Sequence, residues 1–368
     1  MRENNLFSSF KIGERILKNR FIVAPMTRAS ADSMGIPSLK MQAYYHAFAN
    51  GGFSAIITEG TYTDNVNSQA LLLQPGIVSS KQIDAWKGIT NKIHQYDCLA
   101  ICQLMHAGAL TDTGQGIAPS AIRPLGLKMT KAGIGCQQYP VPKTMDYKDI
   151  KTVVDGFVAS ARAAQMAGFD GVEIHAANGY LLDQFITPYT NFRTDDYGGS
   201  IENSFRIIRE ILTEIKMVVN AGFVIGLRVS ESKVNDLTYR WPDGAGFANE
   251  LFGKIANCEL SYIHIAAEGG NWERECLYAD GTSSCSIARE LTKLPIIANG
   301  GLHDLQEAEK IVETGHSDLI AIGRAAIADP QWVNKIQQGF LPIIFDKGMI
   351  NPSFNLDNTA DFFKRMEN

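Results

Sequence analysis

Short runs of apolar, often β-branched residues recur along the chain, each bounded by glycine, proline or small polar residues. Within a run nearly every residue is apolar, without the alternation expected of a strand that faces water on one side. This pattern is typical of parallel strands buried on both faces. The eight predicted strands are 21–26, 54–60, 98–105, 171–177, 224–230, 262–268, 295–301 and 319–325.

The segments between these runs have the period of amphipathic helices. The clearest follows Asp146, where apolar residues from Ile150 to Ala164 fall on one stripe with charged residues elsewhere. A second stripe runs from Ile207 to Val218. Glycines that suit a left-handed helix cap mark three helix ends: Gly168, Gly222 and Gly315.

Strand–helix units in series predict an α/β fold, a (β/α)8 TIM barrel forming a single domain over residues 1–368. The competing topology, a doubly wound open sheet, usually has a glycine-rich turn after its first strand. Here that turn reads APMTRAS, which favours the barrel. Residues from about 107 to 146 are too many for an ordinary connection, so we predict a lid or hairpin insertion after the third strand.

Composition and charge narrow the class of protein. The net charge is -5 and no block of lysine or arginine occurs, so nothing favours nucleic acid or an anionic membrane as a partner. No apolar run reaches the ~20 residues of a membrane helix, and the first residues do not resemble a signal peptide. The six cysteines are scattered without a CxxC pair, which favours core thiols over a metal site. We therefore expect a cytoplasmic enzyme without a metal, with its oligomeric state left open.

Candidate ligand-binding residues follow the strands, where barrel enzymes carry their chemistry. Gly300 and Gly301 follow the seventh strand, and Gly323 and Arg324 follow the eighth. They favour a phosphate site over the alternative of simple tight turns. Arg228, inside the fifth strand, must either pair with a carboxylate or serve an anionic or electron-rich ligand.

Two further strand ends carry polar side chains. Gln103 suits the edge of a heterocycle, although a satisfied core amide is the alternative. His175 and Asn178 could direct two donors at one carbonyl or nitro oxygen, or could simply hold a turn. Tyr180 could donate a proton, or serve as an aromatic lid residue. We interpret His106, just past the third strand, as structural and leave it out of the site.

Three segments carry a family resemblance: NRFIVAPMTRA at 19–29, HAANGYLLDQF at 175–185 and NFRTDDYGGSIEN at 191–203. GLRVS at 226–230 and AIGRAAIADP at 321–330 fit the same pattern in the same order. Over roughly residues 6–340 the chain resembles the Old Yellow Enzyme family of FMN-dependent oxidoreductases.

The resemblance implies a tightly bound FMN, with NADPH or NADH as hydride donor. It implies a two-step reduction of the activated double bond of α,β-unsaturated carbonyl compounds, and as an extension of nitro compounds. His175 and Asn178 would bind the substrate oxygen, and Tyr180 would donate the proton. The implied FMN-binding residues are Ala24, Pro25, Met26, Thr27, Gly60, Gln103, His175, Arg228, Asn299, Gly300, Gly301, Gly323 and Arg324.

Departures from the family pattern keep alternatives open. Ala109 and Lys143 stand where many relatives have arginine, and we expect both to lie in loops that shape the substrate entrance. The acidic loop after the sixth strand is also unusual. The alternatives are an FMN-barrel dehydrogenase with a different physiological substrate, and a flavin-binding sensor or storage protein without turnover.

Overall fold

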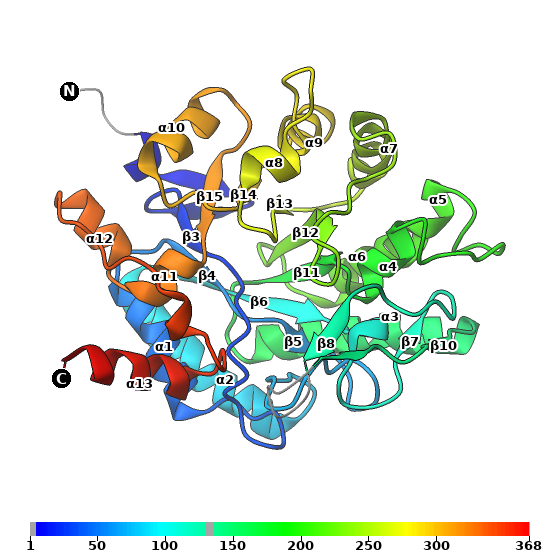
Figure 1. Ribbon diagram of the computed structural model, residues 1–368, viewed down its shortest axis with the longest axis horizontal. Helices are drawn as coiled ribbons and strands as arrows, with labels where there is room; N and C mark the ends of the chain where they lie inside the picture. The colour runs from blue at the N-terminus through cyan, green and yellow to red at the C-terminus, as the bar shows by residue number, and fades with distance from the viewer. Residues whose placement is uncertain (1–4, 130–135, 368) are drawn as a thin grey trace.

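Eight parallel strands close into a barrel in the computed structural model, which describes residues 5–129 and 136–367 (Figure 1). In their order around the barrel, the strands are β3 (Phe21–Val23), β4 (Ala55–Ile57), β6 (Leu99–Met105), β11 (Gly171–Asn178), β12 (Val224–Lys233), β13 (Tyr262–Ala266), β14 (Ile296–Asn299) and β15 (Leu319–Ile322). Pairing of β15 with β3 and of β6 with β11 completes the circle. The short strand β5 (Thr61–Tyr62) adds to β6. The predicted barrel is confirmed and the open sheet is excluded.

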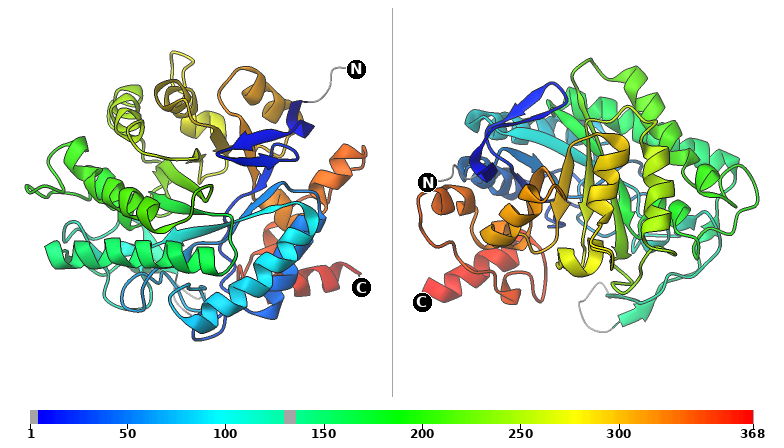
Figure 2. Two further views of the ribbon diagram at one scale, coloured as in Figure 1. Left: turned by 180° about the vertical axis from the view of Figure 1, so that it is seen from behind. Right: turned by 90° about the horizontal axis from the view of Figure 1, so that it is seen from above.

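Helices surround the strands and cover their outer faces (Figures 1 and 2). They are α1 (Leu39–Asn50), α2 (Ser80–Ile93), α3 (Tyr147–Met166), α4 (Leu181–Ile186), α5 (Ile201–Ser204), α6 (Arg206–Val218), α7 (Ala245–Ile255), α8 (Trp272–Cys276), α9 (Ser284–Thr292), α10 (Leu305–Glu313), α11 (Arg324–Ala328), α12 (Trp332–Gln337) and α13 (Leu356–Glu367). Single 3-10 turns are η1 (Asn5–Phe7), η2 (His94–Tyr96), η3 (Gly108–Leu110) and η4 (Lys347–Met349). No helix in the described ranges is long and apolar enough to cross a membrane.

The long helix α3 shows how the sequence sets these elements. Asp146 and Asp149 form a capping box, in which each side chain accepts the other residue's backbone N–H. The predicted apolar stripe is buried against the barrel. Gly168, with φ of +82°, lies just past the end of the helix, in the left-handed conformation that glycine adopts without steric cost.

The amino-terminal end of the barrel is closed by a hairpin. It consists of β1 (Phe10–Ile12) and β2 (Arg15–Leu17), drawn in dark blue (Figure 2). Ile12 and Leu17 are fully or almost fully buried, and they pack on residues at the start of the barrel strands, such as Val224 and Tyr262. Because apolar side chains fill this end of the barrel, the candidate ligand site is sought at the carboxyl ends of the strands.

The long segment after β6 contains two small sheets. Strands β7 (Ile117–Ala118) and β10 (Lys143–Thr144) pair in parallel, and β8 (Leu127–Met129) pairs antiparallel with β9 (Cys136–Gln138). The connection between β8 and β9 lies outside the described residues. The role of this insertion as a lid, and the single-domain organisation, stay predictions.

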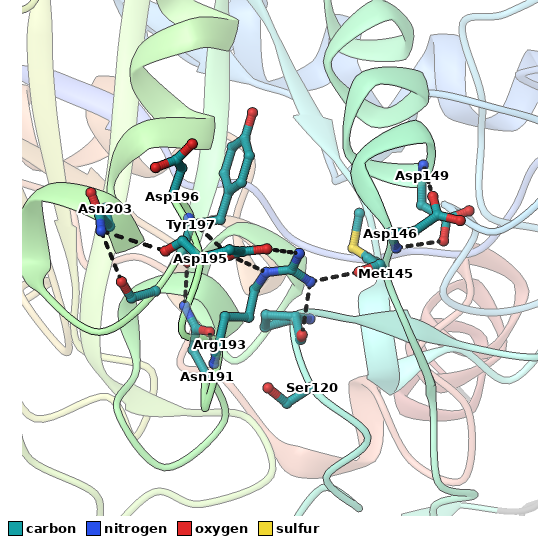
Figure 3. A network of polar contacts seen from close by, with 12 residues as sticks. Ser120, Met145, Asp146, Asp149, Asn191, Arg193, Asp195, Asp196, Tyr197 and Asn203 are labelled. Carbon is teal, nitrogen blue, oxygen red and sulfur yellow. Dashed lines mark hydrogen bonds and ion pairs between the residues drawn. The ribbon is translucent and has the colours of Figure 1, made fainter.

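Arg193 ties the insertion to the barrel (Figure 3). Its guanidinium binds both carboxylate oxygens of Asp195, at 3.0 and 2.5 Å. It also donates to the backbone carbonyls of Pro119 at 3.2 Å and Met145 at 2.6 Å. Pro119 and Met145 lie on opposite sides of the β8–β9 pair in sequence, so one side chain anchors both arms of the insertion. The NFRTDDYGGSIEN segment therefore supports the structure and does not line the cavity described next.

Candidate active site

A cavity of about 390 Å³ opens at the carboxyl ends of the strands. This volume falls within the range of small-molecule sites. Every residue predicted for FMN binding or catalysis lines it: Ala24, Pro25, Met26, Thr27, Gly60, Gln103, His175, Asn178, Tyr180, Arg228, Asn299, Gly300, Gly301, Gly323 and Arg324. The fold thus brings together residues from seven strand ends, as the order of the predicted strands requires.

One end of the cavity is built from glycine and arginine. Gly300 and Gly301 have φ of +138° and +76°. A Cβ on Gly300 would lie 2.5 Å from the Cβ of Ala267, and one on Gly301 would lie 2.6 Å from the carbonyl of Gly270. Arg324 is exposed here, and its guanidinium has no hydrogen bond or ion pair with another described residue. A free guanidinium beside bare backbone is suited to a phosphate.

The inner wall of the cavity carries a buried charge network. Glu173 on β11 accepts hydrogen bonds from Gln103 Nε2 at 2.8 Å, Tyr262 Oη at 3.1 Å and His264 Nδ1 at 2.9 Å. Burial raises the pKa of Glu173, but His264, Arg228 and Gln103 together outweigh it, and the net pKa lies below the ordinary value. Glu173 was not predicted from the sequence, although an acidic residue in the apolar run GVEIHAA was a signal.

This network orients Gln103 and leaves Arg228 partly free. Because Gln103 donates its N–H to Glu173, its side-chain carbonyl is the atom left to accept from a ligand. Arg228 is buried, donates from Nη2 to Asn299 Oδ1 at 3.4 Å, and has no partner at Nε. A buried N–H without a partner costs free energy, so this position is suited to an acceptor atom of a ligand.

A bulge at the end of β11 directs two polar side chains into the cavity. The register of β11 against β12 shifts between Ala176 and Asn178, and Asn178 has φ of +62°. This conformation is tolerated by asparagine and is fixed by Ser230, whose Oγ accepts the Asn178 N–H at 2.8 Å. Asp183 accepts the next N–H, from Gly179, at 2.6 Å. His175 and Asn178 are consequently both buried with atoms that lack partners, His175 Nδ1 and Asn178 Oδ1.

The protonation states in this part of the cavity follow from burial. Burial lowers the pKa of His175 well below its usual value, and Arg228 and His264 add to the effect. His175 is therefore neutral near pH 7 and can donate from one ring nitrogen. Burial and the nearby Glu268 raise the pKa of Tyr180 above its ordinary value, so its phenol is protonated. The rings of His175 and Tyr180 lie 5.2 Å apart.

Two parts of the cavity wall were not predicted from the sequence as site residues. Glu268, in the loop after β13, lines the cavity and accepts a hydrogen bond from Asn178 Nδ2 at 2.7 Å. The C-terminal segment adds Ile350 and Phe354 to the wall. An acidic residue at a strand end was a signal for Glu268. In contrast, nothing in the local sequence pattern indicates that the C-terminal segment lies against the cavity.

Arg28 holds the C-terminal segment against the barrel. Its fully buried side chain donates to the carbonyls of Phe354 at 2.8 Å and Asn355 at 3.2 Å, and to Thr359 Oγ1 at 2.5 Å. The following helix, α13, packs beside α1 (Figure 1). Because Arg28 directly follows Thr27, which lines the cavity, these hydrogen bonds connect the C-terminal segment to the cavity wall.

Glu59 supports the same loop and predicts a pH effect on stability. Its Oε2 accepts the backbone N–H groups of Arg28 and Ala29 at 2.9 and 3.0 Å. Burial raises its pKa to about 7, against the effect of those hydrogen bonds. The folded protein therefore holds this proton more tightly than the unfolded chain, and the stabilisation present below about pH 4.5 is lost as the pH rises through 7.

We expect the free energy of unfolding of the native protein to fall by about 3 kcal/mol more than that of Glu59→Gln between pH 4.5 and 8. Glutamine keeps an acceptor for the two N–H groups but does not titrate. Urea unfolding of both proteins across this range measures the difference. Parallel pH profiles would contradict the assignment.

The two positions that depart from the family pattern lie outside the cavity lining. Ala109 is buried beside the start of the insertion, and Lys143 forms a surface ion pair with Asp149 at 2.8 Å. Lys143 thereby adds a cation to the capped start of α3. Neither residue lines the cavity, and their role in shaping its entrance stays a prediction.

Comparison with known proteins agrees with this geometry. Residues 5–341 match the model of the NADH:flavin oxidoreductase / NADH oxidase family. A probable flavin mononucleotide-dependent alkene reductase of Leishmania infantum is 32% identical over 338 residues, covering 89% of each chain. The NADH oxidase of Thermoanaerobacter brockii is 30% identical over 345 residues, which are 91% of this chain but only 51% of that protein. The chain thus spans about half the length of that relative.

A solved structure shares the whole architecture. The Old Yellow Enzyme homologue of Zymomonas mobilis superposes with a TM-score of 0.84 at 26% sequence identity. The match covers 97% of this chain and 99% of the homologue.

Proposed function

The chain belongs to the NADH:flavin oxidoreductase / NADH oxidase family, as its Old Yellow Enzyme resemblance predicted, and we propose that it is an FMN-dependent reductase of activated carbon–carbon double bonds. NADH or NADPH is the proposed electron donor, and an α,β-unsaturated carbonyl or nitro compound the proposed acceptor. The observation that carries the proposal is the convergence of His175, Asn178 and Tyr180 on a cavity that is also lined by glycines and an arginine suited to a phosphate.

The residues present fit FMN. Arg324 and the crowded glycines Gly300 and Gly301 would hold its phosphate, and they leave no room for a Cβ there. The Gln103 carbonyl and the unpartnered Arg228 Nε offer an acceptor and a donor to the polar edge of the ring system. When bound, FMN supplies the hydride transfer, and the protein supplies position and charge.

The side chains facing the cavity have defined tasks in this reaction. Neutral His175 and the Asn178 amide donate to the substrate oxygen, on which negative charge builds during reduction. The protonated phenol of Tyr180 gives its proton to the substrate carbon next to the carbonyl. Burial keeps His175 neutral and the Tyr180 phenol protonated, as these tasks require.

A three-step spectroscopic experiment tests the proposal. Purified protein should be yellow, lose its flavin absorbance with NADPH under anaerobic conditions, and regain it when 2-cyclohexenone is added. Flavin reduction without reoxidation by any activated alkene would favour a dehydrogenase of another substrate. Folded protein that binds no FMN would contradict the proposal altogether.

Loss of the Arg324 guanidinium should weaken FMN binding. Arg324→Ala removes a charge-assisted contact to phosphate, and we expect the Kd for FMN to rise about 10–100-fold. Titration of flavin-free protein, followed by quenching of FMN fluorescence, measures this Kd. Arg289→Ala is the matched control, because Arg289 pairs with Asp318 away from the cavity. A change of less than about twofold for Arg324→Ala would place the phosphate elsewhere.

A further inference from the structure

Glu268 places a carboxylate inside the proposed substrate site. It follows β13, its side chain is exposed to the cavity, and its Oε2 accepts a hydrogen bond from Asn178 Nδ2 at 2.7 Å. Burial of its surroundings raises the pKa of Glu268, while Arg228 and Arg324 oppose that effect. The reaction proposed above does not use this carboxylate.

The backbone that carries Glu268 is held in place. Its N–H donates to Ser232 Oγ at 3.3 Å, and Ser232 Oγ donates to the buried Glu275 at 2.5 Å. The next N–H, from Gly269, also binds Glu275, at 3.0 Å. These contacts hold the loop without any ligand, so the backbone from which the Glu268 side chain extends has a defined position.

This contact sets the orientation of the Asn178 amide. An amide has two N–H donors on one side and one carbonyl acceptor on the other. With the Glu268 carboxylate beside it, the nitrogen side is favoured, since a rotated amide would place its oxygen against a negative group. One N–H then binds Glu268 and the second remains available to a ligand, while Asn178 Oδ1 is buried without a partner.

We propose that Glu268 is a positioning residue, which holds the Asn178 amide so that its free N–H points at the substrate oxygen. The inference rests on the proposed function. It predicts that Glu268 acts on the substrate only through Asn178. A group that merely stabilises the loop, or that attracts or repels ligands by its charge, would act equally well without Asn178.

A double-mutant cycle separates these cases. The measured quantity is the Kd of cyclohexanone, a ketone without a reducible double bond, read from the shift of flavin absorbance in the FMN-loaded enzyme. We expect Glu268→Ala to raise this Kd about tenfold. Glu268→Gln should stay within about threefold of the native protein, because its carbonyl accepts the same N–H. In an Asn178→Gly background, which keeps the positive φ, Glu268→Ala should have almost no effect.

Two results would overturn the inference. One is an equal loss in both backgrounds, and the other is native affinity in Glu268→Ala. FMN content and melting temperature of each variant report folding, and Glu268→Leu repeats the test with a side chain of similar size. Failure of the proposed function itself would appear differently, as native enzyme whose reduced flavin is not reoxidised by 2-cyclohexenone.

Discussion

Tyr180→Phe is expected to slow reduction of 2-cyclohexenone by about 10²–10⁴-fold, the usual contribution of a well-placed proton donor. The substitution removes one hydroxyl and keeps the ring that packs 5.2 Å from His175. Flavin reduction by NADPH requires no proton from this phenol, so that step should change little. The loss should therefore appear only when the alkene reoxidises the flavin.

Stopped-flow absorbance of the two half-reactions measures this separation. Tyr96→Phe is the matched control, because the Tyr96 hydroxyl contacts His46 at 3.0 Å on the outside of the barrel. Unchanged alkene turnover in Tyr180→Phe would show that another group, or water, delivers the proton.

Removing both proposed donors to the substrate oxygen should also have a large effect. In the double variant His175→Phe with Asn178→Gly, we expect kcat/KM for the alkene to fall about 10²–10³-fold, as when preorganised donors are removed from an oxyanion site. Phenylalanine keeps a ring next to Tyr180, and glycine accepts the positive φ at position 178. FMN content should stay close to native.

The native enzyme provides an internal check on this prediction. Because burial keeps the pKa of His175 well below its ordinary value, alkene reduction should show no ionisation of this residue between pH 6 and 8. A double variant with native kcat/KM would contradict the donor assignment. A histidine-dependent break in the native pH profile would show that His175 reacts in its charged form.

The sequence predicted those parts of the molecule that depend on local pattern. Strands buried on both faces are apolar throughout, so β11 and β12 were visible as runs, and their ends located His175 and Arg228. The acidic residue in the apolar run of β11 signals a buried charge, but the role of Glu173 was not foreseen, because its partner His264 lies 91 positions away. The wall formed by Phe354 depends likewise on Arg28, 326 positions away.

The hairpin that plugs the amino-terminal end of the barrel also constrains kinetics. With Ile12 and Leu17 filling that end, the proposed nicotinamide donor and the proposed alkene acceptor would both reach the cavity from the carboxyl ends of the strands. If both bind at the same place in the cavity, the first must leave before the second binds, and we expect double-displacement kinetics. We then expect an excess of either reactant to inhibit binding of the other, because the closed amino-terminal end leaves both the same cavity.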